Sequence, residues 1–193
     1  MSTIKYQKNK PGFTITELVV AAGIIAMISV MVVVNFRGAN QKAALDNEAE
    51  RLSTILRQAN INSLIGLTVA GARPVGGFGL HLVTCATDCF YWLFADGDSD
   101  HLYNDINPDE DDTLIQRFGT LDDNVYINQI ILPLPVGQPQ PASLDLVFLP
   151  PQGLVFINGA TTYSEAQITL GFKNTSYTKV ITLDSKSGRI NIE

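Results

Sequence analysis

The sequence places one acidic side chain, Glu17, at the start of a long apolar run. From Leu18 to Val34 only Ser29 is polar, and no basic residue adjoins Glu17. An ionisable group in a membrane segment costs on the order of 3 kcal/mol or more, and by default it is a functional candidate. Such a carboxylate can form a charge-assisted pair with a cation, or it can reach the lipid headgroups from the end of the helix.

A second candidate is the group His81, Cys85 and Cys89, whose H-x3-C-x3-C spacing suggests zinc. If the two cysteines face each other across a hairpin, His81 lies about 13 Å further along its strand, whereas a zinc ligand must lie about 2 Å from the metal. Opposed strand residues have Cα atoms about 4.5–5.5 Å apart, close to disulfide range. We therefore expect a Cys85–Cys89 disulfide, with free thiols and a metal site as the alternatives.

A third candidate is the acidic stretch 95–112, "ADGDSDHLYNDINPDEDD". Oxygen ligands at alternate residues are typical of Ca²⁺ loops. An EF-hand that starts at Asp96 would need Gly and Glu where His101 and Asn107 stand, so that template fails. A second frame, 105–111, also alternates oxygen ligands but lacks the glycine turn. A calcium loop of another kind and a solvated acidic loop both remain open. The calcium ligands would come from Asp96, Asp98, Asp100, Asp105, Asn107 and Asp109.

Catalytic patterns are missing from the sequence. The chain has two histidines and contains neither G-x-S-x-G nor H-E-x-x-H. We find no glycine-rich phosphate loop that follows a strand and opens a helix. We therefore do not expect an enzyme, and we assign no cofactor beyond calcium as a candidate.

The elements that position these residues begin with a membrane anchor. The apolar stretch from Phe13 to Phe36 is long enough to span a bilayer, which needs roughly 20 residues. Lys5, Lys8 and Lys10 precede it, so the positive-inside rule keeps the N-terminus in the cytoplasm and the rest of the chain outside. A cleaved signal peptide and a plain signal anchor are alternatives, but neither explains the acid at the start of the run.

The anchor continues into an amphipathic helix. Leu45, Ala49, Leu52, Leu56 and Ala59 follow spacings of four, three, four and three, which describe one face of an α-helix. The charged residues Lys42, Glu48, Glu50, Arg51 and Arg57 lie mainly off that stripe. The helix should run to about residue 65, where a glycine can end it, and its second half should pack on a globular domain.

From residue 78 onward, short apolar runs alternate with turn residues, which predicts β-strands. Four prolines exclude the segment 132–141 from a central strand, so we expect it to be a surface crossover. A long helix followed by strands predicts an α+β fold with the helix packed on an antiparallel β meander. The predicted strands are 78–84, 90–95, 144–149, 153–157, 166–172, 178–184 and 188–192.

Composition agrees with an anchor plus one domain. The chain has 193 residues, and its apolar fraction of 46% is ample for a core. A net charge of −6 argues against a nucleic-acid partner, which usually needs a basic patch. No repeat of 20–50 residues is present, which disfavours a solenoid or a propeller.

The N-terminal motif resembles a known family. The segment "KPGFTITELVVAAGII" is similar to the leader of type IV pilins and type II secretion pseudopilins, in which a basic leader, Gly, Phe, Thr-x-x-Glu and an apolar helix follow one another. Gly12, Phe13, Thr14 and Glu17 stand at the matching places.

The resemblance implies cleavage between Gly12 and Phe13 by a prepilin peptidase and N-methylation of the new Phe13 amine. In this family the glutamate matching Glu17 pairs with the N-terminal amine of a neighbouring subunit. The implied organisation is a cleaved leader at 1–12, a membrane and filament-core helix at 13–36, an amphipathic helix at 37–66 and a β domain at 67–193. The implied partners are membrane lipid before assembly, other pilins or pseudopilins, and an assembly platform in the inner membrane.

Within this family the GspH/FimT type of minor pseudopilin is the most similar, because "RLSTILRQANINSLIG" resembles its helix end and the final "GRINI" resembles its closing strand. Some of its members bind DNA through Gly-Arg-x-Arg, but here Asn191 replaces the second arginine after Gly188 and Arg189. We therefore expect a filament subunit that does not bind nucleic acid. A major pilin, or a membrane-tethered calcium-binding or adhesive domain that does not polymerise, is the alternative.

Overall fold

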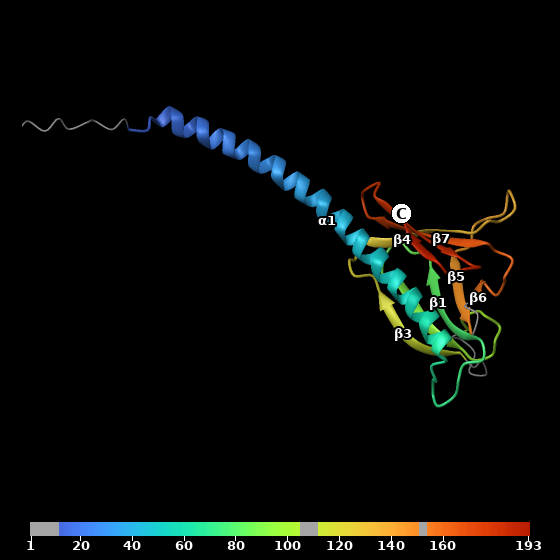
Figure 1. The fold of residues 1–193 in the computed structure, drawn as a ribbon. Coiled ribbons are helices and arrows are strands. Elements are labelled where there is room, and N and C mark those ends of the chain that lie inside the picture. Colours follow the sequence, from blue (N-terminus) through green and yellow to red (C-terminus); the bar gives the residue numbers. More distant parts are fainter. Residues whose placement is uncertain (1–11, 105–111, 151–153) are drawn as a thin grey trace, which may run out of the picture. The chain divides into compact units, whose positions relative to one another are not determined.

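The computed structural model describes residues 12–104, 112–150 and 154–193 of the chain. These residues form two compact units, Met1–Asn40 and Gln41–Glu193, each of which is treated separately below. Helix α1, Ile15–Ile65, contributes to both units, and all nine strands belong to the second unit. The predicted α+β class, with one long helix and antiparallel sheets, is confirmed (Figure 1).

Helix α1 ends where the sequence predicts. Gly66 has a φ of +64°, in the left-handed region that glycine adopts without a Cβ clash. Its N–H donates to the carbonyl of Ser63, and the N–H of Leu67 donates to the carbonyl of Asn62. These two bonds form a Schellman motif, which satisfies carbonyls at the helix end that have no partner within the helix.

In the first unit the helix exposes its apolar side chains. The membrane-length window of α1 is not buried against any other described part of the protein. Phe13 is 80% exposed, and Ile25, Val30 and Met31 are each more than 60% exposed. The length and composition of this segment suffice to cross a membrane, so the membrane anchor is supported in this coarse sense.

In the second unit the helix packs with one face on the β-strands. The predicted stripe is buried, since Leu45, Ala49, Leu52, Leu56 and Ala59 are each at most 2% exposed. They join apolar residues from both sheets in one buried cluster. Figure 1 shows this half of α1 lying against the strands.

The strands form two antiparallel sheets and not the single meander that the sequence suggested. The five-stranded sheet has the order β3-β2-β1-β5-β6, and the four-stranded sheet has the order β4-β7-β8-β9. The strands are β1 Gly77–Val83, β2 Phe90–Asp96, β3 Thr113–Gly119, β4 Val125–Ile131, β5 Ser143–Leu149, β6 Leu154–Ile157, β7 Glu165–Phe172, β8 Thr178–Asp184 and β9 Ile190–Ile192.

Strands β3 and β4 were missing from the sequence-based prediction. Both lie at the edge of their sheets. Residues 113–117 of β3 are all exposed, so no buried face appears in its sequence pattern. In β4 the register shifts between Ile127 and Gln129, which breaks the alternation of apolar and polar residues.

Segment 132–141 connects β4 of one sheet with β5 of the other, as the prolines predicted. Gln140 fixes the start of this crossover. Its side-chain oxygen accepts a hydrogen bond from the N–H of Leu132, and its amide nitrogen donates to the carbonyl of the same residue. The amide thereby satisfies the backbone N–H and carbonyl of Leu132, as a neighbouring strand would.

Candidate functional site

The first site is the N-terminus of helix α1, where Thr14 and Glu17 form a reciprocal cap. Glu17 Oε2 accepts hydrogen bonds from the N–H of Thr14, at 3.0 Å, and from Thr14 Oγ1, at 2.9 Å. The N–H of Glu17 donates to Thr14 Oγ1 at 3.3 Å. This is a capping box, and the S/T-x-x-E pattern that predicts one is present in the sequence. The position of Glu17 at the start of the apolar run had suggested a membrane role, but this capping role was not predicted.

The cap lies on a shallow apolar surface of the helix. The lining residues are Phe13, Thr16, Glu17, Val20, Ala21 and Ile24. A Cβ added at Gly12 would meet no other described residue beyond its chain neighbours within 4 Å, so this side of the predicted cleavage point between Gly12 and Phe13 is open. The site can present one carboxylate to a cation that approaches along an otherwise apolar face.

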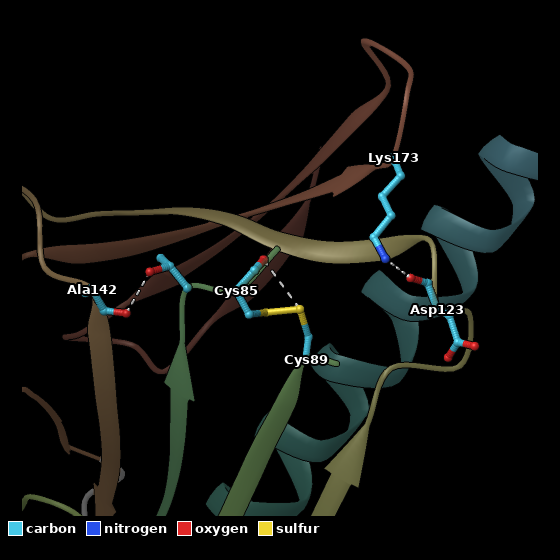
Figure 2. The surroundings of a disulfide bond; sticks show 6 residues. Cys85, Cys89, Asp123, Ala142 and Lys173 are labelled. Atoms are coloured by element: carbon cyan, nitrogen blue, oxygen red, sulfur yellow. Dashed lines mark hydrogen bonds between the residues drawn. A yellow bond between two sulfur atoms is a disulfide. The ribbon is translucent and has the colours of Figure 1, made fainter. Parts of the chain in front are cut away.

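The second site is the disulfide between strands β1 and β2 (Figure 2). The Sγ atoms of Cys85 and Cys89 lie 1.94 Å apart, and their Cα atoms lie 5.5 Å apart. The N–H of Cys85 donates to the carbonyl of Ile127 in β4, and Thr84 donates to the carbonyl of Ala142 just before β5. The disulfide therefore closes the connection between β1 and β2, and backbone hydrogen bonds link this connection to both sheets.

His81 does not join the cysteines. Its Nδ1 lies 2.6 Å from Asp145 Oδ1 on the neighbouring strand β5, and its ring lies 5.3 Å from that of Trp92. Two cysteines that are bonded to each other have no thiolate to offer a zinc ion. The structure thus favours the disulfide over the metal alternative for these residues.

Replacing both Cys85 and Cys89 by serine should destabilise the domain modestly. The disulfide closes a loop with a sequence separation of four residues, so the chain-entropy model gives a loss of about 2 kcal/mol. Urea unfolding of the full chain in mild detergent, followed by fluorescence of the single tryptophan, measures the change. Alkylation of both cysteines in the native, unreduced protein would contradict the disulfide.

The third site is an acidic cluster between β2 and β3. Carboxylate oxygens of Asp96, Asp98 and Asp112 all lie within 4.8 Å of one another. Asp112 was not in the predicted ligand set, and Asp100 is in that set but outside this cluster. The Asp100 side chain instead accepts bonds from the N–H of Leu102 and the side-chain amide of Asn104. The predicted ligands Asp105, Asn107 and Asp109 lie outside the described residues.

Burial makes this cluster electrostatically costly. Asp96 is fully buried, and burial raises the pKa of its carboxyl. Burial likewise raises the pKa of Asp112 to about 6. Backbone donors offset part of the cost, because Asp96 accepts from the N–H groups of Ser99 and His101 and Asp112 accepts from that of Gly97. His101 Nδ1 also lies 2.8 Å from Asp96.

The chemistry that fits this cluster is binding of one hard cation. Ca²⁺ takes oxygen ligands at 2.3–2.6 Å, so oxygens within 4.8 Å of one another can share one ion. We expect saturating Ca²⁺ to raise the Tm of the full chain by about 5–10 °C when its concentration is a hundredfold above Kd. Asp112→Asn should abolish most of that rise, because it removes one of the three carboxylates.

The matched control for this prediction is Asp123→Asn. Asp123 is an exposed acid outside the cluster whose carbonyl, and not its side chain, bonds to Lys173 (Figure 2). It should leave the calcium effect unchanged. A Tm that does not move with millimolar Ca²⁺, measured by differential scanning calorimetry, would show that the cluster is not a calcium site.

A fourth polar group, Glu48, was missed by the sequence analysis. It is 1% exposed and lies between helix α1 and the five-stranded sheet. Its Oε1 accepts the Tyr91 hydroxyl at 2.8 Å, and its Oε2 accepts the N–H of Leu121 at 2.8 Å. Arg51 Nη1 lies 3.9 Å from Oε2 and donates to the carbonyl of Gly119 at 2.6 Å. Burial and the nearby Glu48 charge raise the pKa of Tyr91. These hydrogen bonds join helix α1 to strand β2 and to the segment after β3.

Comparisons of the chain with protein-family models, with curated proteins and with solved structures find no match.

Proposed function

We propose that the chain is a membrane-inserted filament subunit of the type IV pilin or type II pseudopilin kind, most similar to the GspH/FimT minor subunits. The observation that carries the proposal is the first unit of helix α1, whose apolar side chains are exposed and whose N-terminus carries a single carboxylate. A lipid bilayer can cover that apolar surface before assembly, and the helices of other subunits can cover it afterwards.

The carboxylate adds a preference for the assembled state. A buried charge that lacks a partner costs several kcal/mol, whereas a charge-assisted pair in a dry environment is strong. After cleavage, the Phe13 amine of an adjacent subunit is a cation that could meet Glu17. The pair would fix the axial position of one subunit relative to the next.

The capping box is compatible with this second role. The side-chain hydrogen bonds that Glu17 forms within the described residues all use Oε2. An ionised carboxylate has about four lone-pair sites on two oxygens. Glu17 can therefore keep the Thr14 bonds in the membrane and accept a cation through Oε1 during assembly.

The proposed life cycle starts in the inner membrane as a single-pass protein with its β domain outside. A prepilin peptidase removes residues 1–12 on the cytoplasmic side, and an assembly platform then draws the subunit into a pilus or pseudopilus. The Cys85–Cys89 pair supports an outside location, because disulfides persist in oxidising compartments.

Mass spectrometry of the protein purified from a host with an active prepilin peptidase tests the processing. The expected N-terminal peptide begins with N-methylated Phe13 and lacks residues 1–12. Gly12→Leu is the matched control, and it should leave the leader attached. Recovery of the wild-type chain with its leader intact would contradict the proposal.

A membrane-tethered calcium-binding domain is the second candidate, and the cluster of Asp96, Asp98 and Asp112 favours it. That function needs the anchor but not the charge of Glu17. Substitutions at Glu17 therefore separate the two candidates.

A further inference from the structure

A groove on the second unit carries two lysine side chains. It is lined by Lys42, Leu45 and Asp46 of helix α1 and by residues 176–179, where strand β8 begins. Lys179 Nζ lies 3.0 Å from Asp46 Oδ1. Lys42 Nζ lies 4.9 Å from the centroid of the Tyr177 ring, and no ion pair is recorded for it among the described residues.

The groove suits an anion with several oxygen acceptors. Two lysines and one aspartate line it, and Lys179 is paired with Asp46, so the lining carries a net positive charge, although the whole chain has a net charge of −6. Ser176, Tyr177 and Thr178 also line the groove, and their side chains carry hydroxyl donors. A phosphate group can accept from both ammonium groups and from a hydroxyl at once.

Chain length limits how far this groove can lie from the membrane. Phe36 is the last large apolar residue of the anchor segment, and Lys42 follows six residues later. Those six residues span about 9 Å as a helix and at most about 20 Å when fully extended. The headgroup layer extends about 5–8 Å beyond the hydrocarbon core on each side. With Phe36 at the edge of the hydrocarbon core, the backbone of Lys42 therefore lies at most about 15 Å outside the headgroup layer.

We propose that this groove binds the phosphate of an anionic phospholipid headgroup while the subunit is stored in the membrane. The inference rests on the proposed membrane insertion and names the lipid class that the subunit must release when it enters a filament. Lys42 and Lys179 provide the charge, and Asp46 orients Lys179 at the edge of the groove.

Native mass spectrometry of the full chain in mild detergent, with added phosphatidylglycerol or phosphatidylcholine, tests the proposal. The wild type should retain phosphatidylglycerol in preference. Lys42→Gln and Lys179→Gln should each weaken that binding about fivefold, and the double variant about 25-fold. Lys42→Arg combined with Lys179→Arg should restore binding. Lys186→Gln, an exposed lysine of the β8–β9 turn, should have no effect.

Three results would overturn the proposal. The first is equal phosphatidylglycerol retention by the wild type and by a double glutamine variant with an unchanged Tm. The second is binding of soluble glycerol phosphate as tightly as of the lipid and with the same lysine dependence, because the groove would then serve a soluble ligand. The third is loss of subunit cross-linking in the double variant with lipid retention intact, because the groove would then contact protein.

Flotation with liposomes after an alkaline wash tests membrane insertion separately. A chain that fails to float would refute the proposed function. Lysine-dependent selectivity for phosphatidylglycerol in that same chain would still show a headgroup site in the groove, but not its use by a membrane-stored subunit, so the two failures are distinguishable.

Discussion

Replacing Glu48 by alanine should lower the free energy of unfolding by about 3–5 kcal/mol. The substitution leaves the Tyr91 hydroxyl and the N–H of Leu121 without their acceptor. Each unsatisfied buried donor costs about 1–3 kcal/mol. It also removes the carboxylate near Arg51, whose guanidinium lies 5.9 Å from the Tyr91 ring centroid and 5.5 Å from that of Phe118. Urea unfolding of the full chain in mild detergent, monitored by Trp92 fluorescence, measures the loss.

Two variants distinguish the loss of the Glu48 hydrogen bonds from a general effect of substitution on the helix. Glu48→Gln should cost less than alanine, because the amide oxygen can accept from Leu121 while the amide nitrogen donates to a rotated Tyr91 hydroxyl. Glu50→Ala changes an exposed acid two residues away and should stay within about 0.5 kcal/mol of the wild type. If Glu48→Ala were as stable as Glu50→Ala, the buried hydrogen bonds would contribute no net stability.

Glu48 also shows where prediction from sequence fails in the helix. The apolar stripe was predictable because Leu45, Ala49 and Leu52 repeat at helical spacing. Glu48 lies three residues after Leu45 and four before Leu52, so geometry places it on the same face. Its charge suggested exposure, but the partners that make burial tolerable, Tyr91 and the N–H of Leu121, come from distant segments. A local sequence pattern cannot reveal such partners.

The ligands of the acidic cluster were predicted incompletely for a related reason. Alternation along the chain suggested ligands at Asp96, Asp98 and Asp100. The pairing of Ala95 with Thr113 instead brings Asp96, the last residue of β2, close to Asp112, the residue just before β3. That contact depends on the register between two strands, and β3 itself was not recognised. By contrast, the disulfide was predictable because the two cysteines are close in sequence and a hairpin places them in range.

Glu17→Ala should abolish self-association of the mature chain, and this is the largest functional effect that we expect. Removal of one partner from a buried charge pair costs about 3–5 kcal/mol, which is a hundredfold or more in an association constant. Co-purification of two differently tagged copies from membranes, together with the yield of sheared surface fibres, measures the effect. Insertion of each variant into the membrane is checked in parallel.

The capping box makes glutamine the decisive substitution at this position. Glutamine at the third helical residue can still bond back to the N–H of Thr14, so Glu17→Gln preserves the cap and removes only the charge. Thr14→Ala does the converse, because it removes the hydroxyl that caps the helix and keeps the acid. If the chain is a filament subunit, the Glu17→Gln variant should fail to self-associate and the Thr14→Ala variant should self-associate. A tethered domain, in which Glu17 only caps the helix, predicts that Glu17→Gln behaves like the wild type.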